Sequence, residues 1–225
     1  MGDAPRICDV VAFDLDGTLV DTTALHVMAT QAAVQEIFGD PAPADLITQS
    51  LGRPLPESMR VVSAGRGQEL DLVQAFLRHY AAHESDGVQC FPDVLPALVA
   101  LRAAGIRLAL LSNKLRRWGL EEIARLGIAS FFDPVVFMED MPIPKPSGFA
   151  LRPILQRLQV APQRVLVIGD GAGDIACARA AGALSGAALW GTHDPAPLLA
   201  ERPDYRFKQI HDALALLDIP HYQED

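Results

Sequence analysis

Two aspartates with one residue between them, Asp14 and Asp16, end an apolar run and are followed by Gly17 and Thr18. In a strand, residues i and i+2 face the same side, so the two carboxylates would lie side by side where the strand stops. Carboxylates this close repel each other unless a cation joins them or one keeps its proton. The pattern favours a divalent-metal site in which one carboxylate attacks and the other moves a proton, although Asp and Gly are also typical of an exposed turn.

Three further polar clusters follow apolar runs later in the chain. They are Ser112-Asn113-Lys114, Lys145 between prolines, and Asp170-Gly171-Ala172-Gly173-Asp174. If each run is a parallel strand, the clusters meet at one edge of a sheet, where such folds bind ligands. Carboxylates for a metal, a hydroxyl and an ammonium suit a phosphoryl group, because its spread negative charge must be neutralised.

The rest of the chain predicts the elements that position these groups. Strands that alternate with helices of about ten or more residues indicate an α/β fold with a doubly wound parallel sheet. The predicted strands are 8–14, 106–111, 134–137, 164–169 and 184–189. The predicted helices between them are 93–104, 116–126, 147–158 and 174–181.

The segment that follows the first strand has a different character, because it shows helical periodicity without strand-like runs. Helices are predicted over 22–38 and 70–83, with a short helix after Pro43. Residues 51–57 are rich in Gly and Pro and are predicted to form a loop.

Composition excludes several kinds of partner. The formal net charge of −9 argues against nucleic acid, because phosphate backbones demand a basic face. No apolar run is long enough to cross a bilayer, and the N-terminus lacks the basic-then-apolar pattern of a secretory signal. The three cysteines are widely spaced and fit core thiols in a reducing compartment. We expect a cytoplasmic protein, monomeric or homodimeric, that binds neither membrane nor nucleic acid.

In order and spacing, the four clusters resemble the motifs of the haloacid dehalogenase superfamily, in the branch of phosphohydrolases with a helical cap after the first motif. The matching segments are FDLDGTLVDT (13–22), LSNK (111–114), KP (145–146) and GDGAGDI (169–175). The resemblance spans nearly the whole chain. It implies a Rossmann-like α/β core of residues 1–19 and 87–225 and an inserted all-helical cap domain of residues 20–86.

The resemblance also assigns roles to the matching residues. Asp14 is expected to form an aspartyl-phosphate, and Asp16 to protonate the leaving alcohol and then activate water. Ser112 and Lys145 are expected to bind the phosphoryl group. The expected cofactor is Mg²⁺, since an oxygen-only ligand set suits this hard cation. Its expected ligand set is Asp14, Asp16 through its backbone carbonyl, Asp170, and Asp174 as a support for the metal's waters or for Lys145.

Substrate contacts are expected from residues of the core and of the cap. The core residues are Gly17, Thr18 and Asn113, and the cap residue is Arg53, whose guanidinium would suit a second anionic group. A solvated surface position is an equally good interpretation of Arg53. His26, near the start of the cap, fits either a helper residue or a partly buried structural histidine.

Other residues also keep a second interpretation. Asp170 and Asp174 could cap the helix that follows them, and Ser112 could be an N-cap. Lys114 could be an exposed cation at a helix start or a substrate contact. The chain departs from the usual motifs at Gly148 and Gly171, where a proline and a serine are common in the superfamily.

Three hypotheses for function follow. The first is a Mg²⁺-dependent phosphatase of a small phosphorylated metabolite, with 2-phosphoglycolate as the best candidate, because 19–22 and 112–114 look most like the phosphoglycolate phosphatase group. The second is a sugar phosphomutase, similar to β-phosphoglucomutase, on the same core. The third is a non-catalytic phosphate-binding module, which the pair Asp14 and Asp16 argues against because a binder needs no paired acid.

Overall fold

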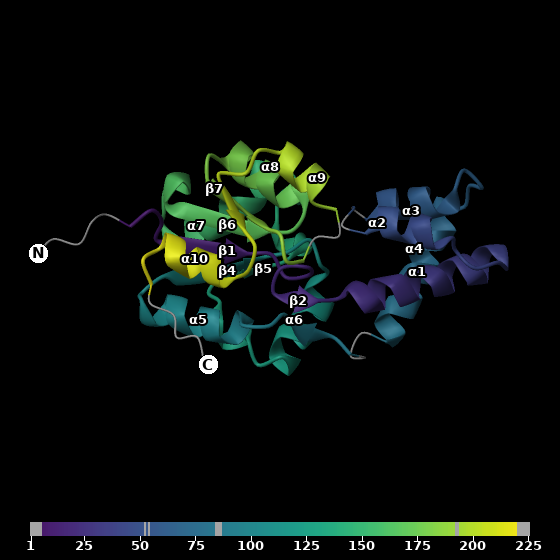
Figure 1. Ribbon diagram of the computed structural model, residues 1–225, viewed down its shortest axis with the longest axis horizontal. Helices are drawn as coiled ribbons and strands as arrows, with labels where there is room; N and C mark the ends of the chain where they lie inside the picture. Colours follow the sequence, from purple (N-terminus) through teal and green to yellow (C-terminus); the bar gives the residue numbers. More distant parts are fainter. Residues whose placement is uncertain (1–5, 52, 54, 84–86, 192–193, 220–225) are drawn as a thin grey trace, which may run out of the picture. The chain divides into compact units, whose positions relative to one another are not determined.

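The computed structural model describes residues 6–51, 53, 55–83, 87–191 and 194–219. The chain divides into two compact units, Met1–Val20 with Cys90–Asp225, and Asp21–Gln89. The first unit carries the main sheet and the second is built from helices (Figure 1).

The first unit contains a six-stranded sheet in the order β5-β4-β1-β6-β7-β8, and its neighbouring strands pair in parallel. Its strands are β1 (Val10–Phe13), β4 (Arg107–Leu111), β5 (Val135–Val136), β6 (Val165–Gly169), β7 (Leu184–Ala188) and β8 (Tyr205–Phe207). The chain adds β4 and β5 on one side of β1 and then returns to add β6, β7 and β8 on the other. The order therefore switches at the carboxyl end of β1, the place where doubly wound sheets bind ligands.

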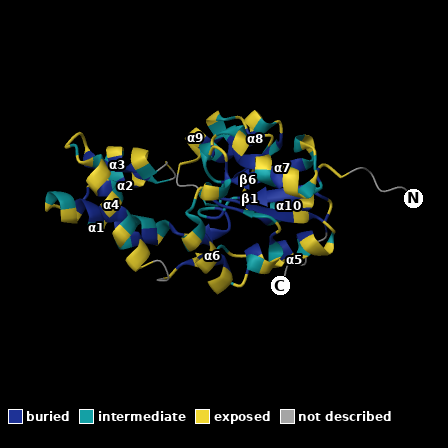
Figure 2. Cartoon of the chain, turned by 180° about the vertical axis from the view of Figure 1, so that it is seen from behind, coloured by how far each residue is buried: buried dark blue, intermediate teal, exposed yellow. Residues whose placement is uncertain are grey.

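Helices cover both faces of this sheet, which confirms the predicted α/β class (Figure 1). One face carries α7 (Arg152–Leu158) and α8 (Ala172–Ala181), and the other carries α5 (Val94–Ala103) and α6 (Arg116–Arg125). The central strands β1 and β6 are buried on both faces (Figure 2). Shorter helices complete the unit: η1 (Ala129–Phe131), η2 (Met138–Asp140), η3 (Gly148–Leu151), η4 (Pro162–Arg164), α9 (Pro195–Ala200) and α10 (His211–Leu216).

A buried cluster fills the space between the sheet and α7 and α8. Alternate strand residues share a face, so Val10 and Ala12 of β1 join Val165 and Val167 of β6 in this cluster. Cys177 belongs to it as well, in agreement with a packing role. Burial raises the pKa of its thiol to about 12, so the thiol stays protonated at neutral pH.

The single helix predicted over 147–158 is wrong in one respect, because the segment forms the 3-10 helix η3 before α7. A Cβ on Gly148 would lie 2.6 Å from the carbonyl carbon of Ala180, at the end of α8. The start of η3 therefore packs directly on backbone, which explains glycine at this position.

The second unit consists of α1 (Thr23–Phe38), α2 (Ala44–Ser50), α3 (Leu55–Ser63) and α4 (Glu69–Ala82). α1 and α4 pack together and bury Leu25 and Ala29 of α1 with Leu72 and Phe76 of α4. The predicted loop over 51–57 is wrong at its end, because α3 starts at Leu55. Pro56 lies in its first turn, where no backbone donor is needed.

A separate two-stranded sheet joins β2 (Val20–Asp21) and β3 (Gln89–Cys90). These strands contain the two points at which the chain passes between the units.

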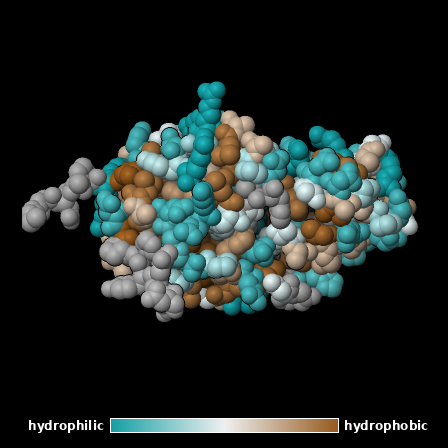
Figure 3. All heavy atoms as spheres, viewed as in Figure 1, coloured by the Kyte–Doolittle hydropathy of each residue, from teal (hydrophilic) through white to brown (hydrophobic). Residues whose placement is uncertain are grey.

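No helix among the residues that the structure describes has the length and apolar character to cross a bilayer. On the face seen in Figure 3, hydrophilic and hydrophobic residues are interspersed.

Candidate active site

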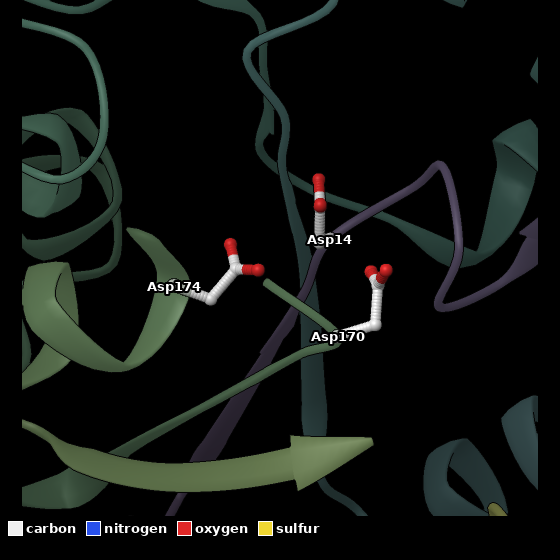
Figure 4. Close-up of side chains that lie close together, drawn as sticks. All are labelled: Asp14, Asp170 and Asp174. Atoms are coloured by element: carbon white, nitrogen blue, oxygen red, sulfur yellow. The ribbon is translucent and has the colours of Figure 1, made fainter. Parts of the chain in front are cut away.

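Three aspartates gather at the carboxyl end of the central strands. Asp14 directly follows β1, and its backbone N–H donates to Ile168 of β6 at 2.9 Å. Asp170 directly follows β6, and Asp174 lies in the first turn of α8. One carboxylate oxygen from each of the three lies within 4.8 Å of the others (Figure 4). The fold thus brings together Asp14 and Asp170, which lie 156 positions apart in the sequence.

Two glycines leave the space that these carboxylates occupy. A Cβ on Gly17 would lie 2.2 Å from Asp170 Oδ2, and the φ of Gly17 is +77°, which an L side chain rarely adopts. A Cβ on Gly169 would lie 2.2 Å from Asp174 Oδ2. The hydroxyl of Thr18 donates to Asp170 Oδ1 at 2.9 Å. Gly17 and Thr18, expected to contact substrate, therefore lie against Asp170.

Lys145 is a buried cation, with only 5% of its side chain exposed. Its Nζ donates to Asp174 Oδ1 at 2.6 Å and to the carbonyl of Leu111 at 2.9 Å, and lies 2.9 Å from Asp14 Oδ1. The other oxygen of Asp174 accepts from Gly171 N–H at 3.0 Å. Asp174 therefore contacts Lys145 and caps α8 at the same time, while its expected support of the metal's waters stays a prediction.

Ser112 and Asn113 directly follow β4. The Asn113 side chain donates to the carbonyl of Lys145 at 2.9 Å and accepts from its N–H at 3.1 Å. Ser112 is buried, and its Oγ accepts from Lys114 N–H at 3.2 Å. Because the N-cap of α6 is Leu115, the alternative of Ser112 as the cap of this helix is wrong.

Among the described residues, the carboxylates of this cluster outnumber the ammonium group that pairs with them. Burial raises the pKa of Asp14 to about 6, with Asp174 and Asp16 adding to the shift and Lys145 opposing it. Burial, with the charges of Asp14 and Asp174, also holds the pKa of Asp170 well above its usual range. The pKa of Lys145 is raised although burial opposes its charge, because attraction to Asp14 and Asp174 outweighs that opposition. One ammonium thus faces three carboxylates.

This arrangement fits a divalent cation. Asp14 Oδ1 is buried, and no donor in the described part of the chain makes a well-directed hydrogen bond to it, although Lys145 Nζ is within ion-pair distance. Carboxylate oxygens are ligands for hard cations such as Mg²⁺, and a cation here would relieve the mutual repulsion. The group that could hold it consists of Asp14, Asp170 and Asp174.

The side chain of Asp16 belongs to a different group. Its Oδ1 lies 2.9 Å from Lys114 Nζ, which also lies 2.9 Å from a carboxylate oxygen of Glu122 on α6. The interpretation of Lys114 as an exposed cation is wrong, because only 5% of its side chain is exposed and its ammonium is bound by two carboxylates, those of Asp16 and Glu122. The sequence analysis missed Glu122. Burial and the charge of Asp16 raise its pKa to about 7, and Lys114 opposes the shift.

The two cap residues singled out in the sequence have contacts within their own unit. Arg53 is exposed, and its Nε donates to the carbonyl of Gln49 at 2.7 Å. The His26 ring lies 5.3 Å from the ring of Phe76 and 5.2 Å from that of Tyr80, centroid to centroid. These contacts agree with the structural interpretation of His26.

Comparison with known proteins agrees with this geometry. The family model described as haloacid dehalogenase-like hydrolase matches residues 11–188. A phosphoglycolate phosphatase from Aquifex aeolicus (strain VF5) is 28% identical over 209 residues, which cover 93% of this chain and 96% of that protein. Pyrophosphatase PpaX from Bacillus velezensis is 27% identical, with 93% of this chain and 96% of that protein covered.

Solved structures show the same relationship. A hydrolase of the haloacid dehalogenase-like family from Streptococcus pneumoniae is similar with a TM-score of 0.82 and 30% identity. The alignment covers 92% of this chain and 97% of that one, so the likeness includes both units.

Proposed function

Because the chain belongs to the haloacid dehalogenase-like hydrolase family, we propose that it is a Mg²⁺-dependent phosphatase of a small phosphorylated metabolite, with 2-phosphoglycolate as the best candidate substrate. The observation that carries this proposal is the cluster of Asp14, Asp170 and Asp174 held against the buried Lys145. Transfer of a phosphoryl group needs neutralisation of its charge together with a nucleophile, and the buried ammonium and the carboxylates of this cluster are groups of the right chemistry for both.

In the proposed mechanism Asp14 is the nucleophile. One of its carboxylate oxygens attacks phosphorus, and the bond from phosphorus to the ester oxygen breaks while Asp16 gives its proton to that oxygen. Asp16, now ionised, then takes a proton from water, and the water oxygen attacks phosphorus. The bond between phosphorus and Asp14 breaks, which releases inorganic phosphate and restores both carboxyl groups.

The other residues hold and neutralise the phosphoryl group. In this proposal Lys145 and Ser112 bind its oxygens, while Asn113 holds the backbone of Lys145 through two hydrogen bonds. Bound Mg²⁺, held by the three aspartates, would supply positive charge that keeps Asp14 ionised and offsets the charge of the phosphoryl oxygens. Without it, the raised pKa of Asp14 leaves a smaller fraction of the nucleophile ionised near neutral pH.

We propose that the helical unit acts as a cap domain and selects the substrate. The relatives named phosphoglycolate phosphatase support a small carboxylated phosphate. We expect the guanidinium of Arg53 to contact the substrate carboxylate, since this pairing can form two parallel hydrogen bonds. The relative named pyrophosphatase makes inorganic pyrophosphate the competing substrate to include in any test.

The test is phosphate release by the wild-type chain and by Asp14→Asn. With Mg²⁺ and 2-phosphoglycolate, glucose 1-phosphate or pyrophosphate, we expect sustained release that is fastest from 2-phosphoglycolate and stops on chelation. Asp14→Asn should lower kcat by about a thousandfold or more while the protein stays folded, because the attacking carboxylate is gone. Full activity of this variant would refute the role of Asp14 as the nucleophile. Isomerisation of glucose 1-phosphate by the wild-type chain without net release of phosphate would favour a mutase.

A further inference from the structure

A second buried charge cluster joins Asp16 to helix α6. The Glu122 side chain is 0% exposed and that of Lys114 is 5% exposed. Lys114 Nζ donates to both Glu122 carboxylate oxygens at 2.9 Å and to Asp16 Oδ1 at 2.9 Å. The proposed mechanism uses Asp16, but it uses neither of the other two residues.

Lys114 is fixed at its backbone as well as at its ammonium. Its N–H donates to Ser112 Oγ at 3.2 Å, and its carbonyl accepts from Met138 N–H at 3.2 Å. Glu122 then holds the far end of the side chain with both oxygens. Buried atoms therefore determine where Lys114 Nζ lies, and Asp16, whose side chain is 27% exposed, is held against that fixed point.

Stability alone does not account for such a chain of charges. Taking a carboxylate and an ammonium out of water costs free energy that their attraction repays only in part, and apolar residues in the same place are often as stable or more so. A buried ion pair that ends on a residue of the candidate site has a further consequence, because it restricts the orientation of that residue. Proton transfer requires such restriction, since donor and acceptor must approach within hydrogen-bond distance.

We propose that Glu122 is a positioning residue that acts through Lys114 to hold the Asp16 carboxyl group in the orientation for proton transfer to the leaving group. The inference rests on the proposed function, in which Asp16 is the proton donor. Glu122 touches no reacting atom. Its effect is confined to the step that Asp16 performs, and this makes it separable from a general effect on the fold.

The leaving group gives the test. An alkyl phosphate such as 2-phosphoglycolate needs a proton on its departing oxygen, whereas p-nitrophenolate leaves readily without one. The measured quantity is kcat/KM, which reports the first chemical step. We expect Glu122→Gln to lower kcat/KM for the alkyl phosphate by about tenfold or more, a part of the 10²–10⁴-fold that general acids contribute, and for p-nitrophenyl phosphate by less than about threefold.

Glu121→Gln is the matched control, because Glu121 is on the same helix with 63% of its side chain exposed and pairs only loosely with Arg117, at 3.7 Å. It should leave both values unchanged. A second variant, Lys114→Met with Glu122→Leu, removes both buried charges at once. Because neither of the two charges is then left buried without its partner, we expect this variant to fold. It should show the same selective loss on the alkyl phosphate.

The positioning role of Glu122 would be overturned if its variants melt like the wild type and lose the same fraction of kcat/KM on both substrates. It would also be overturned if they lose activity on neither substrate. The proposed function fails differently. It is refuted if the wild-type chain releases phosphate from neither substrate, or if Asp14→Asn keeps full activity.

Discussion

The side chain of Asn113 brackets the backbone of Lys145, donating to its carbonyl at 2.9 Å and accepting from its N–H at 3.1 Å. This pair of hydrogen bonds joins the end of β4 to a loop 32 positions later in the chain. An amide is required for it, because one group must donate and the other must accept. The placement of the buried ammonium therefore depends on a residue that need not touch substrate.

Asn113→Asp tests this dependence. The carboxylate can accept from Lys145 N–H but turns a second acceptor toward the Lys145 carbonyl, so one hydrogen bond becomes a repulsion. We expect kcat/KM to fall by on the order of tenfold to a hundredfold, since small displacements of positioning groups have such effects. The loss of stability should be about 1–3 kcal/mol, measured by denaturant unfolding. Wild-type kcat/KM in a folded variant would exclude the positioning role.

Asp170→Asn should stabilise the metal-free protein at alkaline pH. The unfolded chain ionises this carboxyl near pH 4, whereas burial beside Asp14 and Asp174 raises its pKa in the folded state. A raised carboxyl pKa means that stability is lost as pH rises from the unfolded value to the folded value. Asparagine cannot ionise and avoids this loss. In chelator at about pH 8 the variant should melt a few degrees above wild type, and the difference should vanish near pH 4.

The same two proteins should differ in how strongly Mg²⁺ raises their melting temperatures. Binding to the folded state alone raises the melting temperature of wild type as the concentration increases, and loss of a ligand carboxylate should reduce that rise. Asp45→Asn, at an exposed position of α2, is the control and should keep the wild-type response. An equal Mg²⁺ response in Asp170→Asn would remove Asp170 from the metal site.

Gly17→Ala should disrupt the site through contact rather than through backbone strain alone. Its Cβ would lie 2.2 Å from Asp170 Oδ2, and its φ is +77°. Gly127 is the matched control, with a φ of +71° and nothing within 4 Å of an added Cβ. Gly127→Ala should lose about 1–2 kcal/mol of stability and keep its activity. Gly17→Ala should lose more stability and, beyond that, at least about tenfold in kcat/KM. Equal effects of the two substitutions would show that the contact with Asp170 is unimportant.

The candidate site was largely predictable because its residues follow strands that can be recognised locally. Asp14 and Asp170 each end an apolar run, and a parallel sheet brings such ends together. Glu122 was not predictable. It lies beside Glu121 in a charged stretch of helix, and nothing in the local pattern distinguishes the buried glutamate from the exposed one. The burial of its partner Lys114 was not predictable either, since it depends on how α6 packs.

The fold was predictable where elements are long and regular. The central strands were predictable from their apolar runs. The end of α1 was predictable from Gly39, which has a φ of +77°. The three-residue strand β8 and the short helices α9 and α10 were not predicted, because segments of this length carry too little periodicity. In α3, Pro56 was taken as a loop signal although a first helical turn tolerates it.

The pairing of β2 with β3 places the departure and the return of the chain next to each other. The whole of Asp21–Gln89 is therefore connected to the α/β unit as a hairpin loop is connected to its two strands. The pairing of β2 with β3 does not depend on the length or the structure of the segment between them. An insertion, deletion or exchange of helices between β2 and β3 leaves the distance between these two paired strands unchanged. Evolution, or an engineer, can thus redesign one unit while the acidic cluster of the other stays intact.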